Sequence, residues 1–287
     1  MALIAIGLVI AFSLCSFSQS YIHSISPADQ NPSSAPSLKE QELETELDRL
    51  LKNCSGYCER LLNSTFRIQC EEEIRERIYH SHIGKGRILD LEESRQLKGS
   101  EVDTYVYDFR LLYNGEAREE NRVLKLENDQ EKYIENSRLR TAYFKIDYMV
   151  FEPLQFLSPK NHQFFEYRMV GSLKLNDADV YVIQLESTDL LDSEKISSKI
   201  WVEKVDFSVM RMEFEMKSPG IMPGLTKSGD AFQVDSRRIV ELDYLYKIGG
   251  IRFPSLCHVK ESLLAPTMKT SFPRAEIFII YRNYRDI

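Results

Sequence analysis

The sequence lacks the short motifs that mark the common catalytic and cofactor sites. It has no nucleophile elbow, no P-loop, no HExxH zinc motif and no dinucleotide-binding fingerprint. No cluster of lysine and arginine stands out, and the net charge is −7, so a nucleic-acid partner is not expected. These absences point away from an enzyme, and the sequence predicts no cofactor and no metal centre.

The N-terminus lacks a run long enough to cross a bilayer comfortably. Met1 to Leu14 are almost all apolar, whereas a spanning helix needs about 20 such residues. Small polar residues follow, as at a signal-peptide cleavage site. We predict a signal peptide over residues 1–20, although no Lys or Arg precedes the apolar run. Lipidation at Cys15 is the alternative, for which Leu14 is a poor preceding residue.

The rest of the chain has the composition of a folded protein, with 43% apolar and 28% charged residues. Residues 21–36 are rich in Ser, Pro, Asn and Gln, which predicts a flexible tether. A single domain is expected over residues 37–287. Export through the signal peptide would place this domain in the periplasm or at the outer membrane, with membrane contact that is transient or made through an N-terminal anchor.

Four cysteines remain after the predicted cleavage, and an even number in an exported chain suggests disulfides. Cys54 and Cys58 lie one turn apart on the helix predicted below, so a bond between them is the least attractive of the three pairings. We favour Cys58 with Cys70 and Cys54 with Cys257. Reduced, buried thiols are the alternative.

Helical periodicity begins at a capping box that starts at Ser37, and it continues to about Leu62. Further on, two shorter helical pieces are expected between Gln130 and Leu157, the second of them densely apolar. The apolar positions of the first helix are Leu43, Leu47, Leu50, Leu51, Cys54, Cys58, Leu61 and Leu62.

Alternation with a period of two predicts strands along the remaining chain. Turn residues such as Asn114-Gly115, Asn176-Asp177 and Gly249-Gly250 separate successive strands and predict hairpins. The fold class is therefore α+β: a curved antiparallel half-barrel, or incomplete β-barrel, covered by the N-terminal helix and by a mid-chain helical insertion over 143–157. The expected strands are 66–80, 104–113, 121–126, 164–170, 180–185, 199–203, 209–217, 238–248, 251–264 and 275–284.

One hairpin carries a family resemblance. The segment from Lys199 to Phe207 reads Lys-Ile-Trp-Val-Glu-Lys-Val-Asp-Phe, and Val-Met-Arg-Met-Glu follows from Val209. Together with the Val-Gly-Ser at Val170 and the Tyr-Val-Ile at Tyr181, this hairpin resembles the Trp-Val hairpin of the periplasmic lipoprotein carriers and outer-membrane lipoprotein receptors, the LolA/LolB-like superfamily. The chain is most similar to uncharacterised exported bacterial members of that superfamily.

The resemblance implies an incomplete antiparallel barrel whose opening is plugged by helices and whose apolar cavity accepts acyl chains. This chain departs from the carriers in its longer middle insertion and in its cysteines, and no lid-locking residue can be transferred to it. The residues expected to line or rim such a cavity are Tyr105, Tyr107, Phe109, Met149, Phe151, Phe156, Trp201, Met210, Met212, Phe214, Ile221 and Met222.

Several of these residues have a second interpretation. An aromatic stripe such as that ending at Phe109 is more often core packing than a binding surface. The Pro- and Gly-rich segment from Ser218 to Leu225 is expected to be a loop, either at the cavity mouth or folded back on the core. His80, His82 and His258 are a weak metal signal, for which a surface pair of histidines is the simpler explanation.

The function that follows is non-catalytic binding of a lipid or of the acyl chain of a lipidated protein. Such binding would serve the transport of lipids or lipoproteins to the outer membrane. A chain that is held only by burial needs no special polar residues, since each buried methylene contributes about 0.8 kcal/mol. The alternative is an envelope sensor or scaffold of the same fold that binds a protein partner and no lipid. An open apolar hollow favours the first function, and a solidly packed interior favours the second.

Overall fold

The computed structural model describes residues 38–79, 100–142, 144, 148–188, 195–222, 232–265 and 270–287. The predicted signal peptide, Cys15, the tether, His80 and His82 lie outside these residues. The helices are α1 (Leu38–Asn63), η1 (Met149–Phe151), α3 (Pro153–Leu157) and η2 (Pro159–Phe164). The strands are β1 (Phe66–Tyr79), β2 (Ser100–Tyr113), β3 (Arg118–Glu127), β4 (Gln130–Ile134), β5 (Phe165–Leu175), β6 (Ala178–Ser187), β7 (Lys195–Glu203), β8 (Val209–Met222), β9 (Phe232–Asp243), β10 (Tyr246–Ile248), β11 (Ile251–Phe253), β12 (Leu256–Ala265) and β13 (Thr270–Asp286).

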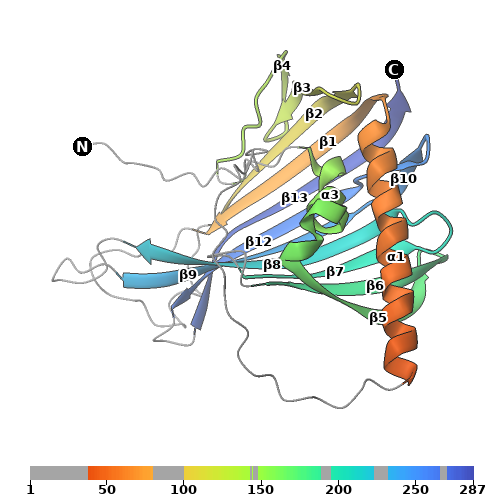
Figure 1. Ribbon diagram of the computed structural model, residues 1–287. Helices are drawn as coiled ribbons and strands as arrows, with labels where there is room; N and C mark the ends of the chain where they lie inside the picture. The colour runs from red at the N-terminus through yellow and green to blue at the C-terminus, as the bar shows by residue number, and fades with distance from the viewer. Residues whose placement is uncertain are drawn as a thin grey trace, which may run out of the picture.

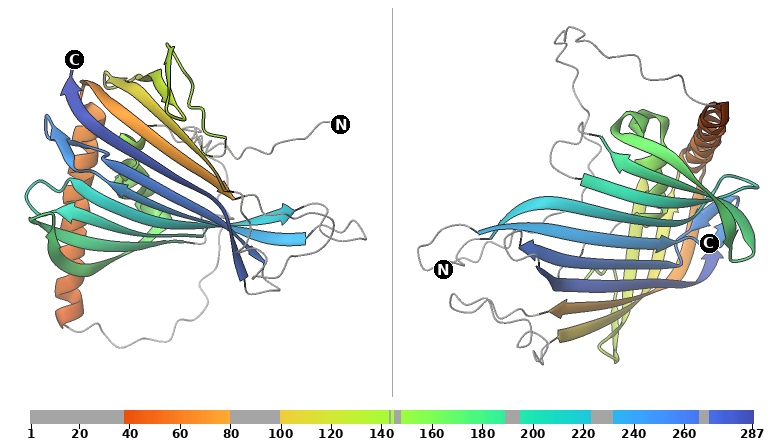
Figure 2. Two further views of the ribbon diagram at one scale, coloured as in Figure 1. Left: turned by 180° about the vertical axis from the view of Figure 1, so that it is seen from behind. Right: turned by 90° about the horizontal axis from the view of Figure 1, so that it is seen from below.

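Eleven strands form one antiparallel sheet in the order β4-β3-β2-β1-β13-β12-β9-β8-β7-β6-β5. The outermost strands, β4 and β5, do not pair with each other, so the sheet curves without closing (Figure 1). Both further views show α1 on the hollow side of this curve (Figure 2). The expected α+β half-barrel covered by helices is confirmed.

The predicted N-terminal helix is confirmed as α1, and its apolar face packs against the concave side of the sheet. From Glu46 onward, where the burial of α1 is described, its buried apolar residues recur every three or four positions, so they form one stripe along the helix. They are Leu50, Cys54, Tyr57, Cys58 and Leu61.

The predicted hairpins are also present, and their turns have the backbone that the sequence requires. Asn176 and Asp177, between β5 and β6, have φ values of 48° and 65°. Positive φ at both central residues is the signature of a two-residue type I′ turn, whose twist matches the flanking strands. In β5 the register with β6 shifts between Met169 and Gly171, which marks a bulge.

Two predictions about the middle of the chain were wrong. Instead of a helix, the residues after Gln130 form β4, because Asn128 and Asp129 both have positive φ and make a hairpin turn with β3. Where the structure describes it, the densely apolar segment before Leu157 gives only η1 and α3. Tyr148 adopts the left-handed conformation immediately before η1, and Pro153 starts α3 afresh, so no long helix continues through this segment.

The segment that begins at Ser218 was also expected to be a loop, and this was wrong for its first half. β8 continues to Met222, which pairs with Phe232 of β9. The residues from Pro223 to Leu225 lie outside the described part of the chain.

Candidate functional site

The concave face of the sheet is the candidate site, and it is occupied by protein. The consecutive pieces η1, α3 and η2, residues 149–164, lie across it beside α1, and we refer to them as the cover (Figure 1). Phe156 of the cover packs between Phe165 of β5 and Phe214 of β8, with ring centroids 5.5 and 5.3 Å away. Phe151 meets Tyr113 of β2 edge-on at 4.9 Å. The cover thus inserts aromatic side chains where a ligand would lie.

Most of the residues predicted to line the cavity come together in one buried cluster, contributed by β2, β8 and the cover. All of them face the concave side and none is more than 8% exposed. They are Tyr105, Tyr107, Phe109, Met149, Phe151, Phe156, Met212 and Phe214.

The prediction that Trp201 lines or rims the cavity was wrong. Its neighbours Ile200 and Val202 are buried in the core, and adjacent residues of a strand point to opposite faces, so Trp201 lies on the convex face. Arg211 lies over its indole ring at 5.7 Å. Met210 is the extra residue of a bulge in β8 and is buried outside the core cluster. Ile221 and Met222 are described only in their backbone, so their predicted role stays a prediction.

The described interior is tightly filled. One hollow, bordered by Ile68, Phe109, Met149 and Tyr281, holds about 10 Å³, which is no more than one water molecule needs. An acyl chain therefore has no room there while the cover occupies its present position.

Buried charges on the concave face form a feature that the sequence interpretation missed. Arg122 of β3 donates to Glu72 of β1 at 2.6 and 3.1 Å and to Glu120 at 2.9 Å. Tyr281 of β13 donates to Glu72 at 2.9 Å, and Glu72 is fully buried. Burial alone would lower the pKa of Arg122, but the two carboxylates outweigh it and raise that pKa.

Three glutamates run from Glu71 to Glu73, a composition typical of a solvated stretch, and yet Glu72 among them is buried. The alternation of β1 could have revealed it, because Glu72 lies between Cys70 and Ile74 on the inward side. Glu76 follows on the same side and is also buried. It accepts backbone N–H groups of Ala142 at 2.7 Å and Phe144 at 3.2 Å.

Single polar contacts attach the cover and the chain leading into it to the sheet and to α1. The Tyr148 N–H donates to Glu120 at 2.6 Å, and the Tyr244 hydroxyl donates to the Met149 carbonyl at 2.9 Å. The Ser55 hydroxyl of α1 donates to the Leu51 carbonyl of its own helix at 2.9 Å and lies 3.4 Å from the Leu157 carbonyl of the cover. The cover makes no strand pairing with the sheet in the described residues. Two further bonds reach the cover, from the Tyr167 hydroxyl to the Phe156 carbonyl and from the Thr188 N–H to the Phe164 carbonyl. Side-chain packing and these bonds hold it in place.

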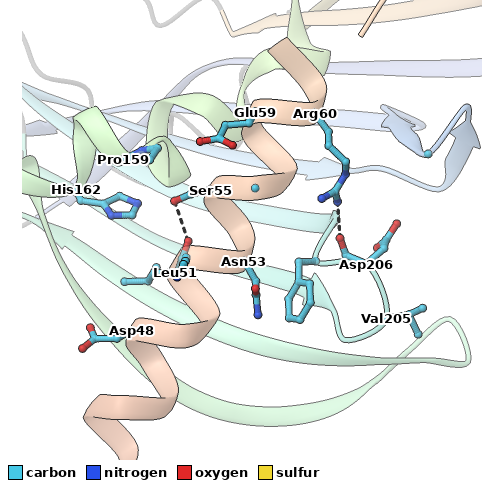
Figure 3. Close-up of a pocket in the computed structure, with 14 residues that line it drawn as sticks. Asp48, Leu51, Asn53, Ser55, Glu59, Arg60, Pro159, His162, Val205 and Asp206 are labelled. Atoms are coloured by element: carbon cyan, nitrogen blue, oxygen red, sulfur yellow. Dashed lines mark hydrogen bonds between the residues drawn. The ribbon is translucent and has the colours of Figure 1, made fainter. Parts of the chain in front are cut away.

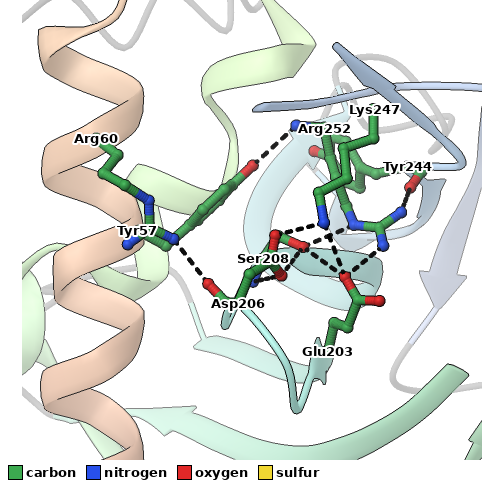
Figure 4. A network of polar contacts seen from close by, with 8 residues as sticks. All are labelled: Tyr57, Arg60, Glu203, Asp206, Ser208, Tyr244, Lys247 and Arg252. Atoms are coloured by element: carbon green, nitrogen blue, oxygen red, sulfur yellow. Dashed lines mark hydrogen bonds and ion pairs between the residues drawn. The ribbon is translucent and has the colours of Figure 1, made fainter. Parts of the chain in front are cut away.

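A second polar network ties α1 to two hairpin turns (Figure 4). Buried Arg252 of β11 donates to Ser208 at 2.7 Å, to Glu203 at 2.7 Å and to the Tyr244 carbonyl at 3.1 Å. Its backbone N–H donates to the Tyr57 hydroxyl of α1 at 3.3 Å. The network positions the helix over one end of the concave face.

Asp206, in the turn between β7 and β8, extends the same network. Arg60 of α1 donates to its carbonyl at 2.7 Å, and Lys247 pairs with its carboxylate at 2.6 Å. Although burial opposes ionisation, hydrogen bonds from Lys247 and Ser208 hold the pKa of Asp206 well below its usual value. The turn is therefore attached to α1 by a hydrogen bond and to β10 by an ion pair.

An open groove of about 960 Å³ runs along the outer side of α1 (Figure 3). Polar and charged side chains of both signs line much of it, including Asp48, Lys52, Glu59 and His162. This groove lies opposite the buried stripe of α1, so it is separate from the concave face. Leu51, Pro159, Val205 and Phe207 add apolar surface to its lining.

The predicted disulfides are absent, because Cys54, Cys58, Cys70 and Cys257 are all free and buried. Cys54 and Cys58 face the sheet from α1, where apolar side chains surround them. Cys70 and Cys257 lie on β1 and β12, which β13 separates. Burial raises the pKa of Cys54 to about 12 and also raises those of the other three thiols. The alternative of reduced, buried thiols describes the structure.

We expect the four thiols to resist alkylation by iodoacetamide in the folded protein, since both burial and a raised pKa suppress the thiolate. All four should react after unfolding in urea without a reductant. Mass spectrometry should then find one carbamidomethyl group on each of the four cysteines. Fewer additions that rise to four only after reduction would show that a disulfide is present.

Of the three histidines considered as metal ligands, the structure describes His258, whose ring packs against other side chains. His258 stacks on Phe278 with centroids 3.9 Å apart and approaches Glu276 at 2.8 Å. In the described ranges, no group of three His, Cys, Asp or Glu side chains is arranged to hold a metal ion. The described helices include none with the length and apolar character that a bilayer-spanning segment needs.

No protein-family model matches the chain, and no curated protein matches its sequence. Among solved structures, a DUF1329 family protein from Desulfovibrio piger is 11% identical with a TM-score of 0.38, over 83% of this chain and 92% of that chain. A LolA superfamily protein from Nitrosomonas europaea is 13% identical with a TM-score of 0.29, over 84% of this chain and 94% of that chain. These values assign neither a superfamily nor a function to this chain.

Proposed function

We propose that this protein is an exported, non-catalytic carrier that binds a lipid, or the acyl chain of a lipidated protein, on its concave face when the cover moves aside. The observation that carries this proposal is the way the cover fills that face. Met149, Phe151 and Phe156 insert apolar side chains into the sheet from a segment that has only short helical turns of its own. An acyl chain can replace the same contacts, since burial of apolar surface has no directional requirement.

The attachment of the cover supports such an exchange. Backbone pairing joins each strand of the sheet to its neighbours, whereas the cover is held by contacts such as Tyr148 to Glu120 and Tyr244 to Met149. Breaking a few hydrogen bonds costs about 1 kcal/mol each, and re-exposing Phe151 and Phe156 costs about 1.5–3 kcal/mol each. A bound chain of 12 or more methylenes contributes about 10 kcal/mol in return.

The filled interior favours a second function, that of an envelope scaffold or sensor that binds a protein partner. In that case the cover is a permanent part of the core, and the 10 Å³ hollow is simply a packing defect. The two functions differ in what happens when room is made under the cover.

Phe156→Ala makes that room. Because its ring lies between Phe165 and Phe214, its removal leaves a cavity on the concave face. If the protein is a carrier, an uncharged fluorescent dodecyl amide should bind the variant about tenfold more tightly than the wild type, although unfolding becomes easier by about 3–5 kcal/mol. Fluorescence titration measures the binding, and urea denaturation measures the stability.

Met210→Ala is the matched control, because Met210 is buried outside the core cluster that contains the cover. It should lose similar stability and leave binding of the probe unchanged. Absence of binding to both the wild type and Phe156→Ala, with both proteins folded, would favour the scaffold function.

A further inference from the structure

The outer face of α1, which borders the open groove, carries a regularly spaced row of residues. They follow one another by three and four positions in turn, which is the spacing of the contact seam between two coiled helices. All but the glycine are exposed, and in the described part of the chain the charged members make no ion pair and no side-chain hydrogen bond. We call these residues the outer row: Arg49, Lys52, Gly56, Glu59 and Asn63.

Gly56 has no explanation within a single copy of the chain. A Cβ atom added there would meet nothing closer than Nη1 of Arg60 at 4.0 Å, so alanine would fit. Glycine inside a helix is less favourable than alanine, because it loses more conformational freedom on folding. It does allow another backbone to approach closely, since no side chain stands in the way. The helix therefore has a notch in the middle of its outer row.

The charges of the outer row match those of the same row in the opposite direction. Position 54 is the midpoint between Arg49 and Glu59, and it is also the midpoint between Lys52 and Gly56. Two copies of α1 that pack antiparallel about this point would place Arg49 of each copy opposite Glu59 of the other. The long side chain of each Lys52 would lie over the notch of the other copy. A two-fold axis repeats every contact, so two ion pairs would form and two notches would be filled.

A turn beside α1 adds apolar surface to the same face. Val205, between β7 and β8, is 85% exposed, the largest fraction among the exposed large hydrophobic residues of the described chain. Arg60 of α1 holds this turn by donating to the Asp206 carbonyl at 2.7 Å, so Val205 stands at the wall of the groove (Figure 3). A second helix in the groove would cover this side chain, and burial of apolar surface favours association.

We infer that two copies of this protein form a dimer through antiparallel, two-fold symmetric pairing of α1 about position 54. The dimer goes beyond the carrier function and does not depend on it, because the buried stripe of α1 faces the sheet, away from the outer row. Exposed ion pairs stabilise little, so we expect a weak dimer with a dissociation constant of about 10–100 µM.

Sedimentation equilibrium of the purified protein, at concentrations from about 2 to 200 µM, measures the dimer. Glu59→Arg places like charges opposite each other and should weaken the dimer at least about tenfold, and Arg49→Glu should do the same. When these two single variants are mixed, each arginine again meets a glutamate. The mixture should therefore form a heterodimer within about threefold of the wild-type affinity, which an interface elsewhere on the molecule would not produce.

Gly56→Gln tests the notch, because it fills the notch with a long, uncharged side chain. It should weaken the dimer at least about fivefold. Glutamine favours a helix more than glycine does, so the thermal midpoint of this variant should not fall, and a lost dimer cannot be a lost fold. Glu131→Arg is the matched control, since it makes the same change of charge at an exposed position of β4 and should leave the dimer unchanged.

Each other outcome contradicts a stated part of the inference. A wild-type protein that stays monomeric at every concentration would overturn the pairing and leave the groove to a different protein. A dimer that neither Glu59→Arg nor Gly56→Gln weakens would overturn the role of α1. Single variants that stay monomeric when mixed would overturn the antiparallel register about position 54. Binding of the dodecyl amide is a separate measurement, so the carrier function can fail while the dimer stands.

Discussion

Replacing Arg122 by methionine is expected to lower the free energy of unfolding by about 3–5 kcal/mol, which is the usual cost of leaving a buried charge without its partner. Glu72 is completely buried and receives two of its hydrogen bonds from Arg122. Methionine keeps much of the volume of the side chain and none of its charge. Urea denaturation followed by circular dichroism measures the loss.

The double variant Arg122→Met/Glu72→Gln separates charge from packing, because it also removes the stranded carboxylate. It should recover at least half of the stability lost in the single variant. Arg110→Met, on an exposed position of β2, is the matched control and should stay within about 0.5 kcal/mol of the wild type. A loss of the same size in Arg110→Met would show that the buried pair has no special importance.

The second large effect is expected at Arg252. Its guanidinium satisfies Ser208, Glu203 and the Tyr244 carbonyl in a buried position, so Arg252→Met leaves three acceptors without their donor. We expect a loss of about 3 kcal/mol, since Glu203 keeps a contact with Lys247 at 3.3 Å. Because the network anchors α1, the helix should also become more susceptible to limited proteolysis.

Lys247→Met is the control for this network. It removes the half-exposed partner of Asp206 and leaves Arg252 in place. An exposed ion pair contributes about 1 kcal/mol or less, so α1 should stay protected from protease. Equal sensitivity of the two variants would mean that the exposed ion pair, and not the buried guanidinium, holds the helix.

The sequence was sufficient to predict the helix α1, most of the strands and the open, covered sheet. Each of these depends on a local pattern: a stripe every three or four residues in α1, alternation in strands such as β2, and turn residues such as Asn176-Asp177. Local patterns failed where two residue preferences competed. The apolar segment before Leu157 has helical composition, but Tyr148 and Pro153 divide it.

The candidate site was harder to predict, because it depends on which elements meet across the sheet. Alternation alone put Tyr107 and Phe214 on the inner face, but it could not show that Phe156 fills the space beside Phe214. The buried pair of Glu72 and Arg122 joins residues 50 positions apart in the chain.

The bulge in β5 has a consequence for how molecules of this protein behave beside one another. An open sheet ends in a strand with unpaired N–H and C=O groups, and such an edge is a template on which a neighbouring chain can add another strand and start aggregation. In β5 the extra residue at Val170 breaks the regular spacing of those groups between Met169 and Gly171. An incoming strand would lose its register there, so the irregularity protects a long free edge from uncontrolled polymerisation.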